Sequence, residues 1–253
     1  MTESLVRARY AIVKTTGHTA FDMVEHAGIL IRDGVIREVG AFGEIQARHP
    51  QLLVVGDGTQ LAVPGFVNAH HHIGLTPFQL GAHDMPLELW GVTRVRQRPV
   101  DGYLDTLYSA FEMISSGITT VQHIHGWLAG SMKDIEARNE AVIRAYEDIG
   151  MRVSYCYGVR DQNHIMYCSD QEMVARMPDD LKGEMQAWID AIEVKLEGGI
   201  DIFKDFYARH NHKRRVKIQM APANLHWCSD DALELLADVA HAYDVPLHMH
   251  LVE

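Results

Sequence analysis

The chain has 253 residues, 47% of them hydrophobic, and a formal net charge of -11 when histidine is counted as neutral. This composition suits one large α/β domain, or a large domain with a small one. The acidic balance argues against nucleic acid or an anionic membrane as the main partner. The three cysteines form no CxxC pair, as expected in a reducing compartment. With no signal peptide and no apolar run near the ~20 residues of a membrane helix, the sequence predicts a cytoplasmic protein.

Residues 1–62 have the pattern of a small β unit. Two stretches of alternating hydrophobic residues flank Asp33-Gly34, which is a strong signal for a two-residue hairpin turn. The expected elements are strands over 5–13, on both sides of the turn within 27–39, and over 52–55, with a short helix over 42–48.

From residue 61 the pattern changes to strands that alternate with helices, which predicts parallel strands joined by right-handed crossovers. An open doubly wound sheet and a (β/α)8 barrel both fit. No GxGxxG follows the first strand, so a dinucleotide-binding sheet loses its main support. The expected strands cover 61–70, 117–124, 151–159, 215–221 and 245–251, and the expected helices cover about 101–115, 134–149, 180–197 and 229–243.

The first of these strands ends in three consecutive histidines. Side chains alternate along a strand, so His70 and His72 should lie on one face and His71 on the other. Two imidazoles one repeat apart can bind a single metal ion. The alternative is that both are ordinary core or surface histidines at the end of a strand.

A second group of polar residues closes the chain. His248 and His250 share a face of the last predicted strand, and Glu253 should lie just past its C-terminal end, where catalytic groups collect in parallel α/β folds. A carboxylate beside a metal ligand can take a proton from water that the metal has acidified. We expect His248 to pack, or to orient a ligand, rather than to bind the metal directly.

These residues resemble the motifs of a known family. Pro64 to His72 is similar to the PGF-(I/V)-N-x-H-x-H opening of the amidohydrolase superfamily, and His250 to Glu253 is similar to its H-x-x-E on the fifth strand. The combination resembles the branch that contains cytosine, guanine and adenosine-type deaminases and triazine hydrolases. The β unit looks like the N-terminal half of that branch's small β-sandwich, and 117–121 looks like its second barrel strand.

The resemblance implies that residues 63–253 form the first part of a (β/α)8 TIM-type barrel, after half a β-sandwich over 1–62. It implies one divalent metal ion, zinc first and iron or manganese as alternatives, with His70, His72 and His250 as ligands and Glu253 as the proton shuttle. The implied activity is hydrolytic deamination of a small nitrogen heterocycle by metal-activated water. A dechlorinating triazine hydrolase, a cyclic amide hydrolase, and an inactive fragment or binding module are the alternatives.

The chain departs from the family pattern in three places. The family places a catalytic His on strand six and a ligand Asp on strand eight, beyond Glu253, so we expect this chain to be the first part of a barrel, with about five strands and exposed sheet edges. Ala223 stands where the family usually has a substrate-contacting His, a role that His226 can take over. His71 replaces the usual small residue.

Residues that follow the strands are candidates for substrate contacts, because the loops at the C-terminal ends of barrel strands build the pocket. Each of them can equally be an ordinary packed or solvated side chain. The expected partner is a small heterocyclic substrate, with family analogy favouring a homo-oligomer and neither nucleic acid nor membrane. The candidates are Gln79 after the first strand, His123 and His125 at the end of the second, and His226 and Trp227 after the fourth.

Overall fold

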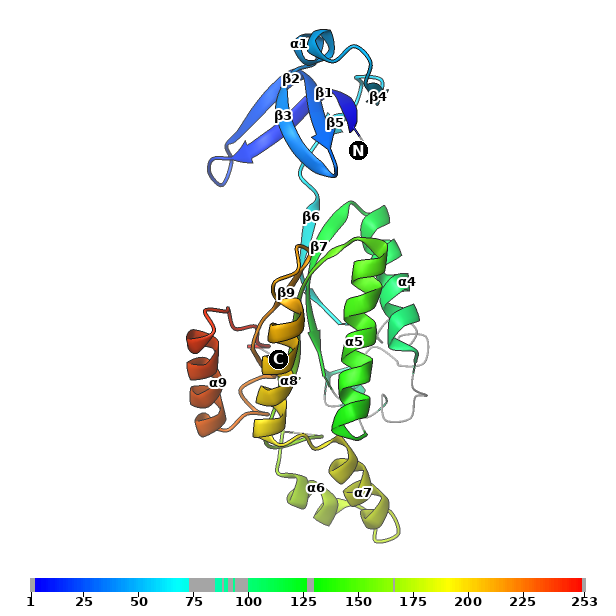
Figure 1. The fold of residues 1–253 in the computed structure, drawn as a ribbon. Coiled ribbons are helices and arrows are strands. Elements are labelled where there is room, and N and C mark those ends of the chain that lie inside the picture. The colour runs from blue at the N-terminus through cyan, green and yellow to red at the C-terminus, as the bar shows by residue number, and fades with distance from the viewer. Residues whose placement is uncertain are drawn as a thin grey trace. The chain divides into compact units, whose positions relative to one another are not determined.

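The computed structural model describes residues 3–72, 85–87, 89, 90, 93, 100–126, 130–165 and 167–251. The chain divides into two compact units, Met1–Gly65 and Phe66–Glu253, each built on its own five-stranded sheet (Figure 1). Among the helices in these ranges, we find none that combines the length and the apolar character needed to cross a bilayer.

The first unit is a mainly antiparallel sheet in the order β3-β2-β1-β4, with β5 also paired to β1. The predicted hairpin at Asp33-Gly34 is confirmed: both residues have positive φ, 50° and 70°, as a tight turn of this kind requires. Leu5, Leu30 and Ile45 form its small core. Its elements are β1 (Glu3–Thr15), β2 (Phe21–Arg32), β3 (Val35–Ala41), α1 (Phe42–Arg48), β4 (Leu53–Val55) and β5 (Leu61–Ala62).

The second unit is an α/β fold with a parallel sheet, as the alternating pattern predicted. The order is β10-β8-β7-β6, with β9 also paired to β8, and each of these pairings is parallel. Its strands are β6 (Phe66–His71), β7 (Ile118–His125), β8 (Arg152–Val159), β9 (Val216–Ile218) and β10 (Ala221–Pro222). Its helices are α4 (Gly102–Ser115), α5 (Met132–Ile149), α6 (Asp170–Arg176), α7 (Lys182–Ile192), α8 (Leu196–His210) and α9 (Asp230–Ala242).

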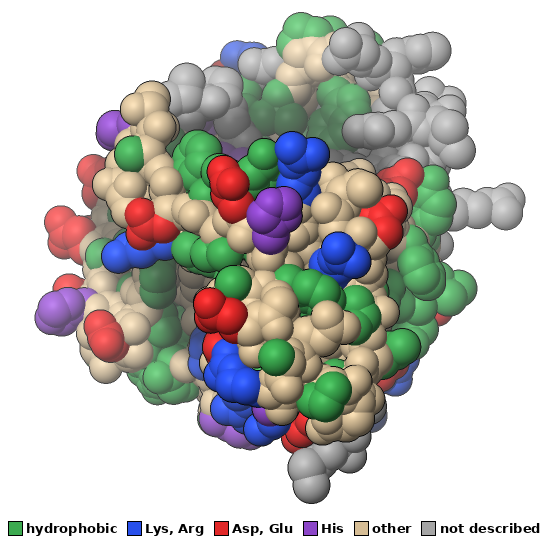
Figure 2. Space-filling view, turned by 90° about the horizontal axis from the view of Figure 1, so that it is seen from above, with side chains coloured by type: hydrophobic (Ala, Val, Ile, Leu, Met, Phe, Trp, Pro, Cys, Tyr) green, Lys and Arg blue, Asp and Glu red, His purple; other side chains and the backbone are tan. Residues whose placement is uncertain are grey.

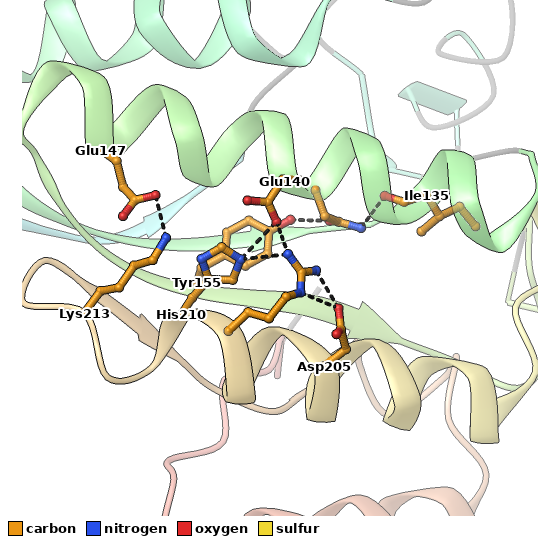
Figure 3. Close-up of polar contacts among 9 residues, drawn as sticks. Ile135, Glu140, Glu147, Tyr155, Asp205, His210 and Lys213 are labelled. Carbon is orange, nitrogen blue, oxygen red and sulfur yellow. Dashed lines mark hydrogen bonds and ion pairs between the residues drawn. The ribbon is translucent and has the colours of Figure 1, made fainter.

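Helices α5 and α8 cover one face of this sheet and form the main core with it (Figure 1). Tyr155 of β8 is 1% exposed and packs between Phe206 of α8 and the buried side of α5. Helix α5 begins at a capping box in which the Ser131 hydroxyl accepts from the Asp134 N–H and the Asp134 carboxylate accepts from the Ser131 N–H. On the rim, ion pairs join α5 to the end of α8 and the residues that follow it, among them Glu140–Arg209 and Glu147–Lys213 (Figure 3).

The predicted helix over 180–197 is wrong in its extent. Helix α7 ends at Ile192, and a separate helix α8 begins at Leu196. The sequence did not predict α8, because Gly198 and Gly199 lie in its first turn and glycine is a poor helix former. A Cβ at Gly199 would lie 2.7 Å from Val159 Cγ1, so the glycine permits the close approach of α8 to β8.

The last two predicted strands are also shorter than expected. The stretch predicted as 215–221 is split into β9 and β10, and the stretch 245–251 forms only two isolated parallel bridges, Met220–Leu247 and Asn224–His250. Its position is nevertheless defined by backbone hydrogen bonds from His248 N–H to the Met220 carbonyl at 3.0 Å and from His250 N–H to the Ala223 carbonyl at 3.3 Å. This segment therefore lies next to β10 and continues the parallel order.

Strand β6 lies at one end of the strand order of the second unit. In the part of the chain that the structure describes, β6 pairs with β7 only, and Phe66 and Val67 are 57% and 64% exposed. On the face drawn in Figure 2, hydrophobic, acidic and basic side chains are intermingled. An open strand edge with bulky apolar side chains can pair with a further strand.

Candidate metal centre

The C-terminal end of β6 carries a β-bulge that decides which way its histidines face. Asn68 pairs with Val121 and His71 with His123, so three steps along β6 match two steps along β7. The Asn68 side-chain oxygen accepts from the His70 N–H at 3.2 Å and so satisfies a backbone donor within the bulge. Beyond it, His71 turns toward the helices, and its ring packs edge-on against His123 with 5.5 Å between centroids. His70 and His72 turn to the other face, as the alternation predicted.

Three imidazoles converge on that other face. His72 Nε2 lies 3.0 Å from His70 Nε2 and 3.1 Å from His250 Nε2. The three rings can offer nitrogen atoms that all lie within 4.8 Å of one another. Tetrahedral coordination at ~2.0–2.1 Å places ligand nitrogens roughly 3.3 Å apart, so the cluster has the size of a metal site. Two segments separated by 178 positions are brought together here.

Backbone carbonyls fix the tautomers of two of these rings. The Ile124 carbonyl lies 2.9 Å from His72 Nδ1, and the Ala223 carbonyl lies 2.8 Å from His250 Nδ1. A carbonyl can only accept, so each ring carries its proton on Nδ1 and presents a lone pair on Nε2. Two lone pairs 3.1 Å apart repel each other unless a cation lies between them. The donor set therefore fits a metal ion.

A fourth imidazole contacts the cluster at His70 Nδ1, on the nitrogen that does not face the other two rings. His248 Nε2 lies 3.0 Å from His70 Nδ1, and the two rings stack with 5.2 Å between centroids and 23° between planes. Burial lowers the pKa of His248, and the neighbouring His70 and His250 lower it further. The His248 ring is thus a neutral partner for the outer nitrogen of His70.

The structure places His123 and His125 away from this cluster, on the face of the sheet that α5 covers. His123 is fully buried, and its Nδ1 lies 2.9 Å from the Tyr146 hydroxyl. His125 Nδ1 lies 3.0 Å from Asn139 Oδ1 and 2.9 Å from the Tyr155 hydroxyl. This differs from the predicted position at the mouth of a pocket, because the register aligns His123 with His71 and not with His72.

Burial also sets the charge state on that face. It lowers the pKa of His71 to about 4 and the pKa of His123 well below its ordinary value, with neighbouring histidines lowering both further. The same burial raises the pKa of Tyr146 and Tyr155 far above the usual tyrosine value. His71, His123, Tyr146 and Tyr155 are therefore neutral groups of the core.

The loop after β10 is attached to the cluster through its backbone. The Asn224 side-chain oxygen accepts from the N–H groups of His226 and Trp227 at 2.9 and 2.8 Å, which makes a tight turn. Trp227 is buried and stacks on Tyr167, and the exposed His226 ring lies 4.7 Å from the same tyrosine. His226 thus lies on the rim of the loop that begins next to Ala223.

Two of the predicted site residues, Gln79 and Glu253, lie outside the described residues. Conversely, four residues that build the centre were missed in the sequence. Ile124 and Ala223 act through backbone carbonyls, which no side-chain pattern reveals. The two asparagines each precede a histidine by two positions, and this Asx-turn spacing could have indicated them. They are Asn68 and Asn224.

Comparison with known proteins gives a consistent picture. The chain is 24% identical over 257 residues to the 5-methylthioadenosine/S-adenosylhomocysteine deaminase of Thermodesulfovibrio yellowstonii, covering 98% of this chain and 49% of that protein. An atrazine chlorohydrolase from Arthrobacter aurescens, crystallised with zinc, superposes with a TM-score of 0.73 at 22% identity, over 98% of this chain and 53% of the other. Escherichia coli guanine deaminase gives 0.68 at 18% identity, over 99% and 53%.

The chain thus spans about half the length of the relatives it matches. The two structural likenesses show the fold. Residues 27–51 match the model of an imidazolonepropionase-like composite domain of bacteria. Residues 61–253, most of the chain and the whole of the histidine cluster, match the amidohydrolase family model. The chain belongs to the amidohydrolase family.

Proposed function

We propose that this chain carries the metal centre of a hydrolase that deaminates a small nitrogen heterocycle. The observation that carries the proposal is the convergence of three Nε2 atoms from His70, His72 and His250, two of them with the proton held on the far nitrogen by a carbonyl. The deaminases among the relatives support the type of reaction. The parallel order of the strands supports a (β/α)8 barrel of which this chain forms part, after half of a β-sandwich.

In this proposal the three imidazoles hold one divalent ion, and neutral nitrogen ligands favour zinc. A bound ion of this kind makes water acidic enough to act as a nucleophile near neutral pH. The protein's own groups orient the site and move protons. Glu253 follows His250 by three positions, and we assign it the transfer of a proton from the attacking water to the leaving amine.

The loop that starts at Ala223 is proposed to form one side of the substrate site. Its backbone is bound to His250 through the Ala223 carbonyl, and its exposed rim carries His226. Trp227 supports this rim from below by stacking on Tyr167. We therefore expect His226→Ala to raise KM for a heterocyclic substrate and to leave metal binding unchanged. Gln79 is proposed as a further substrate contact from the segment after β6.

The test is a metal titration followed by an activity panel. The full-length protein that contains this chain is purified and stripped with a chelator, and zinc is added back. Bound zinc is then compared with that of His72→Ala and of the exposed-residue control His212→Ala. Release of ammonia is then scored with adenosine-type nucleosides and guanine, and release of chloride with a chlorotriazine. One zinc per chain, lost only in His72→Ala, together with zinc-dependent ammonia release, supports the proposal. A chain that binds no zinc, or activity that survives complete metal removal, contradicts it, and chloride release favours the dechlorinating alternative.

A further inference from the structure

The fourth imidazole has a role that the three-ligand cluster does not explain. We propose that His248 is a positioning residue that holds the proton of His70 on Nδ1, so that the Nε2 lone pair of His70 is available to a metal ion. This inference rests on the metal centre of the proposed function. According to this inference, His248 raises the affinity of the centre for metal without being a ligand itself.

The contacts of the three ligand rings differ in kind. His72 and His250 are held by backbone carbonyls, which leave no choice of tautomer. The Nδ1 of His70 instead lies 3.0 Å from a ring nitrogen, which can either donate or accept. His70 is also the most exposed of the three rings. Its tautomer therefore depends on the state of its partner.

Only one proton occupies the hydrogen bond between His70 and His248, and its position decides what the centre can bind. If His248 Nε2 carries it, the neutral His70 ring must keep its own proton on Nε2. That proton then points at His72 Nε2, an acceptor 3.0 Å away, and fills the centre. If His70 Nδ1 carries it, all three Nε2 atoms present lone pairs and the centre accepts a cation.

Binding of a cation therefore selects a second tautomer in two rings at once. His70 moves its proton from Nε2 to Nδ1, and His248 moves its proton from Nε2 to its own Nδ1, so that its Nε2 becomes the acceptor. Both rings stay neutral, and the number of bound protons does not change. Partners of this type commonly alter metal affinity by about 10–100-fold when they are removed.

One segment of the chain carries both the proposed ligand His250 and the positioning residue His248. His248 and His250 are one side-chain repeat apart, and their N–H groups donate to the carbonyls of Met220 and Ala223. The stacked rings of His70 and His248 pair the two segments in the same way as the stacked rings of His72 and His250, whose planes differ by only 10°. A side chain at position 248 is thus held against His70 by the same backbone that places a ligand.

The experiment compares two substitutions of His248. Leu fills a similar volume without an acceptor, and Gln restores one through its amide oxygen. Zinc affinity is measured by competition with a chromophoric chelator, with His241→Leu, an exposed position on α9, as the matched control. We expect His248→Leu to weaken zinc binding about 10–100-fold, and His248→Gln and His241→Leu to stay within about threefold of the parent chain.

Nitrogen-detected NMR of the unsubstituted protein provides the second measurement, and it does not require a stable variant. In the zinc-loaded chain, the His70 and His248 rings should both carry their proton on Nδ1. A His248→Leu chain with unchanged zinc affinity, equal weakening by Leu and Gln, or a zinc-loaded His248 protonated on Nε2 overturns the role of His248 and leaves the three-ligand centre standing. A parent chain that binds no zinc overturns the proposed function itself, and this inference with it.

Discussion

Strands β6 and β7 carry histidines on both faces of one sheet, and the two sets differ in almost every property that matters for chemistry. His70 and His72 lie on the face opposite α5. The Nδ1 atom of each ring contacts a polar partner, and the two Nε2 atoms face each other. His123 and His125 lie beneath α5, anchored through Nδ1 to hydroxyl and amide groups of the core. The same type of side chain presents an imidazole nitrogen to other imidazoles on one face, and it is a buried hydrogen-bonding group on the other. The bulge after Asn68 decides the assignment of the β6 histidines.

The largest difference between the two faces should appear when one ring is removed from each, at the adjacent positions 71 and 72. His72→Ala removes the nitrogen that lies closest to both other rings, and we expect zinc affinity to fall by more than the ~100-fold typical of losing an outer partner. His71→Ala should keep one zinc per chain, because its ring faces His123 and not the cluster. Metal content after dialysis measures both. Loss of zinc from the two variants alike would show that the faces are not independent.

The second prediction concerns the buried face. His123→Leu leaves the Tyr146 hydroxyl without its partner in the core, and a buried unsatisfied group lowers the free energy of unfolding by about 1–3 kcal/mol. Tyr146→Phe should have an effect of similar size, because it removes the hydroxyl that contacts His123 Nδ1. Urea unfolding of both single variants and of the double variant gives the measurement.

The double variant provides the control for that prediction. With both polar groups removed, the double variant should be less destabilised than the sum of the singles, because neither side is left unsatisfied. Zinc affinity should change in none of the three. Strict additivity would mean that the 2.9 Å contact contributes nothing to stability.

A pH series sharpens the same comparison. Burial depresses the pKa of His123, with His125 and His71 adding to the effect, so the folded chain resists a proton that the unfolded chain accepts near the ordinary value of 6.5. The stability that depends on a neutral His123 is complete above pH 6.5 and is lost as the pH falls below it. His123→Leu lacks this loss. The difference in unfolding free energy between parent and variant should therefore shrink from pH 7.5 to pH 5, and a constant difference would contradict the assignment.

The sequence predicted the parts of this arrangement that have a local signal. Alternation placed His70 and His72 on one face, and the Asp33-Gly34 turn and the parallel order of the strands were predicted correctly. Two features had no such signal. A bulge changes register without changing composition, so the position of His123 beneath α5 was not foreseen. Helix α8 was hidden by Gly198 and Gly199, whose value lies in contact with β8 rather than in helix propensity.

The smallest effect is expected on the rim of the buried face, where charged pairs join α5 to the end of α8 and the residues that follow it (Figure 3). Lys213 Nζ and Glu147 Oε2 are 2.9 Å apart, yet each side chain remains about one third exposed. Water and salt screen such a pair, so Glu147→Gln should lower the free energy of unfolding by no more than about 1 kcal/mol. Urea unfolding at low and high salt measures it. If Glu147→Gln lowered the free energy of unfolding as much as His123→Leu does, the charged pairs would stabilise this face as much as the buried contacts do. A smaller loss places that stability in the neutral imidazole–tyrosine contacts, which salt does not screen.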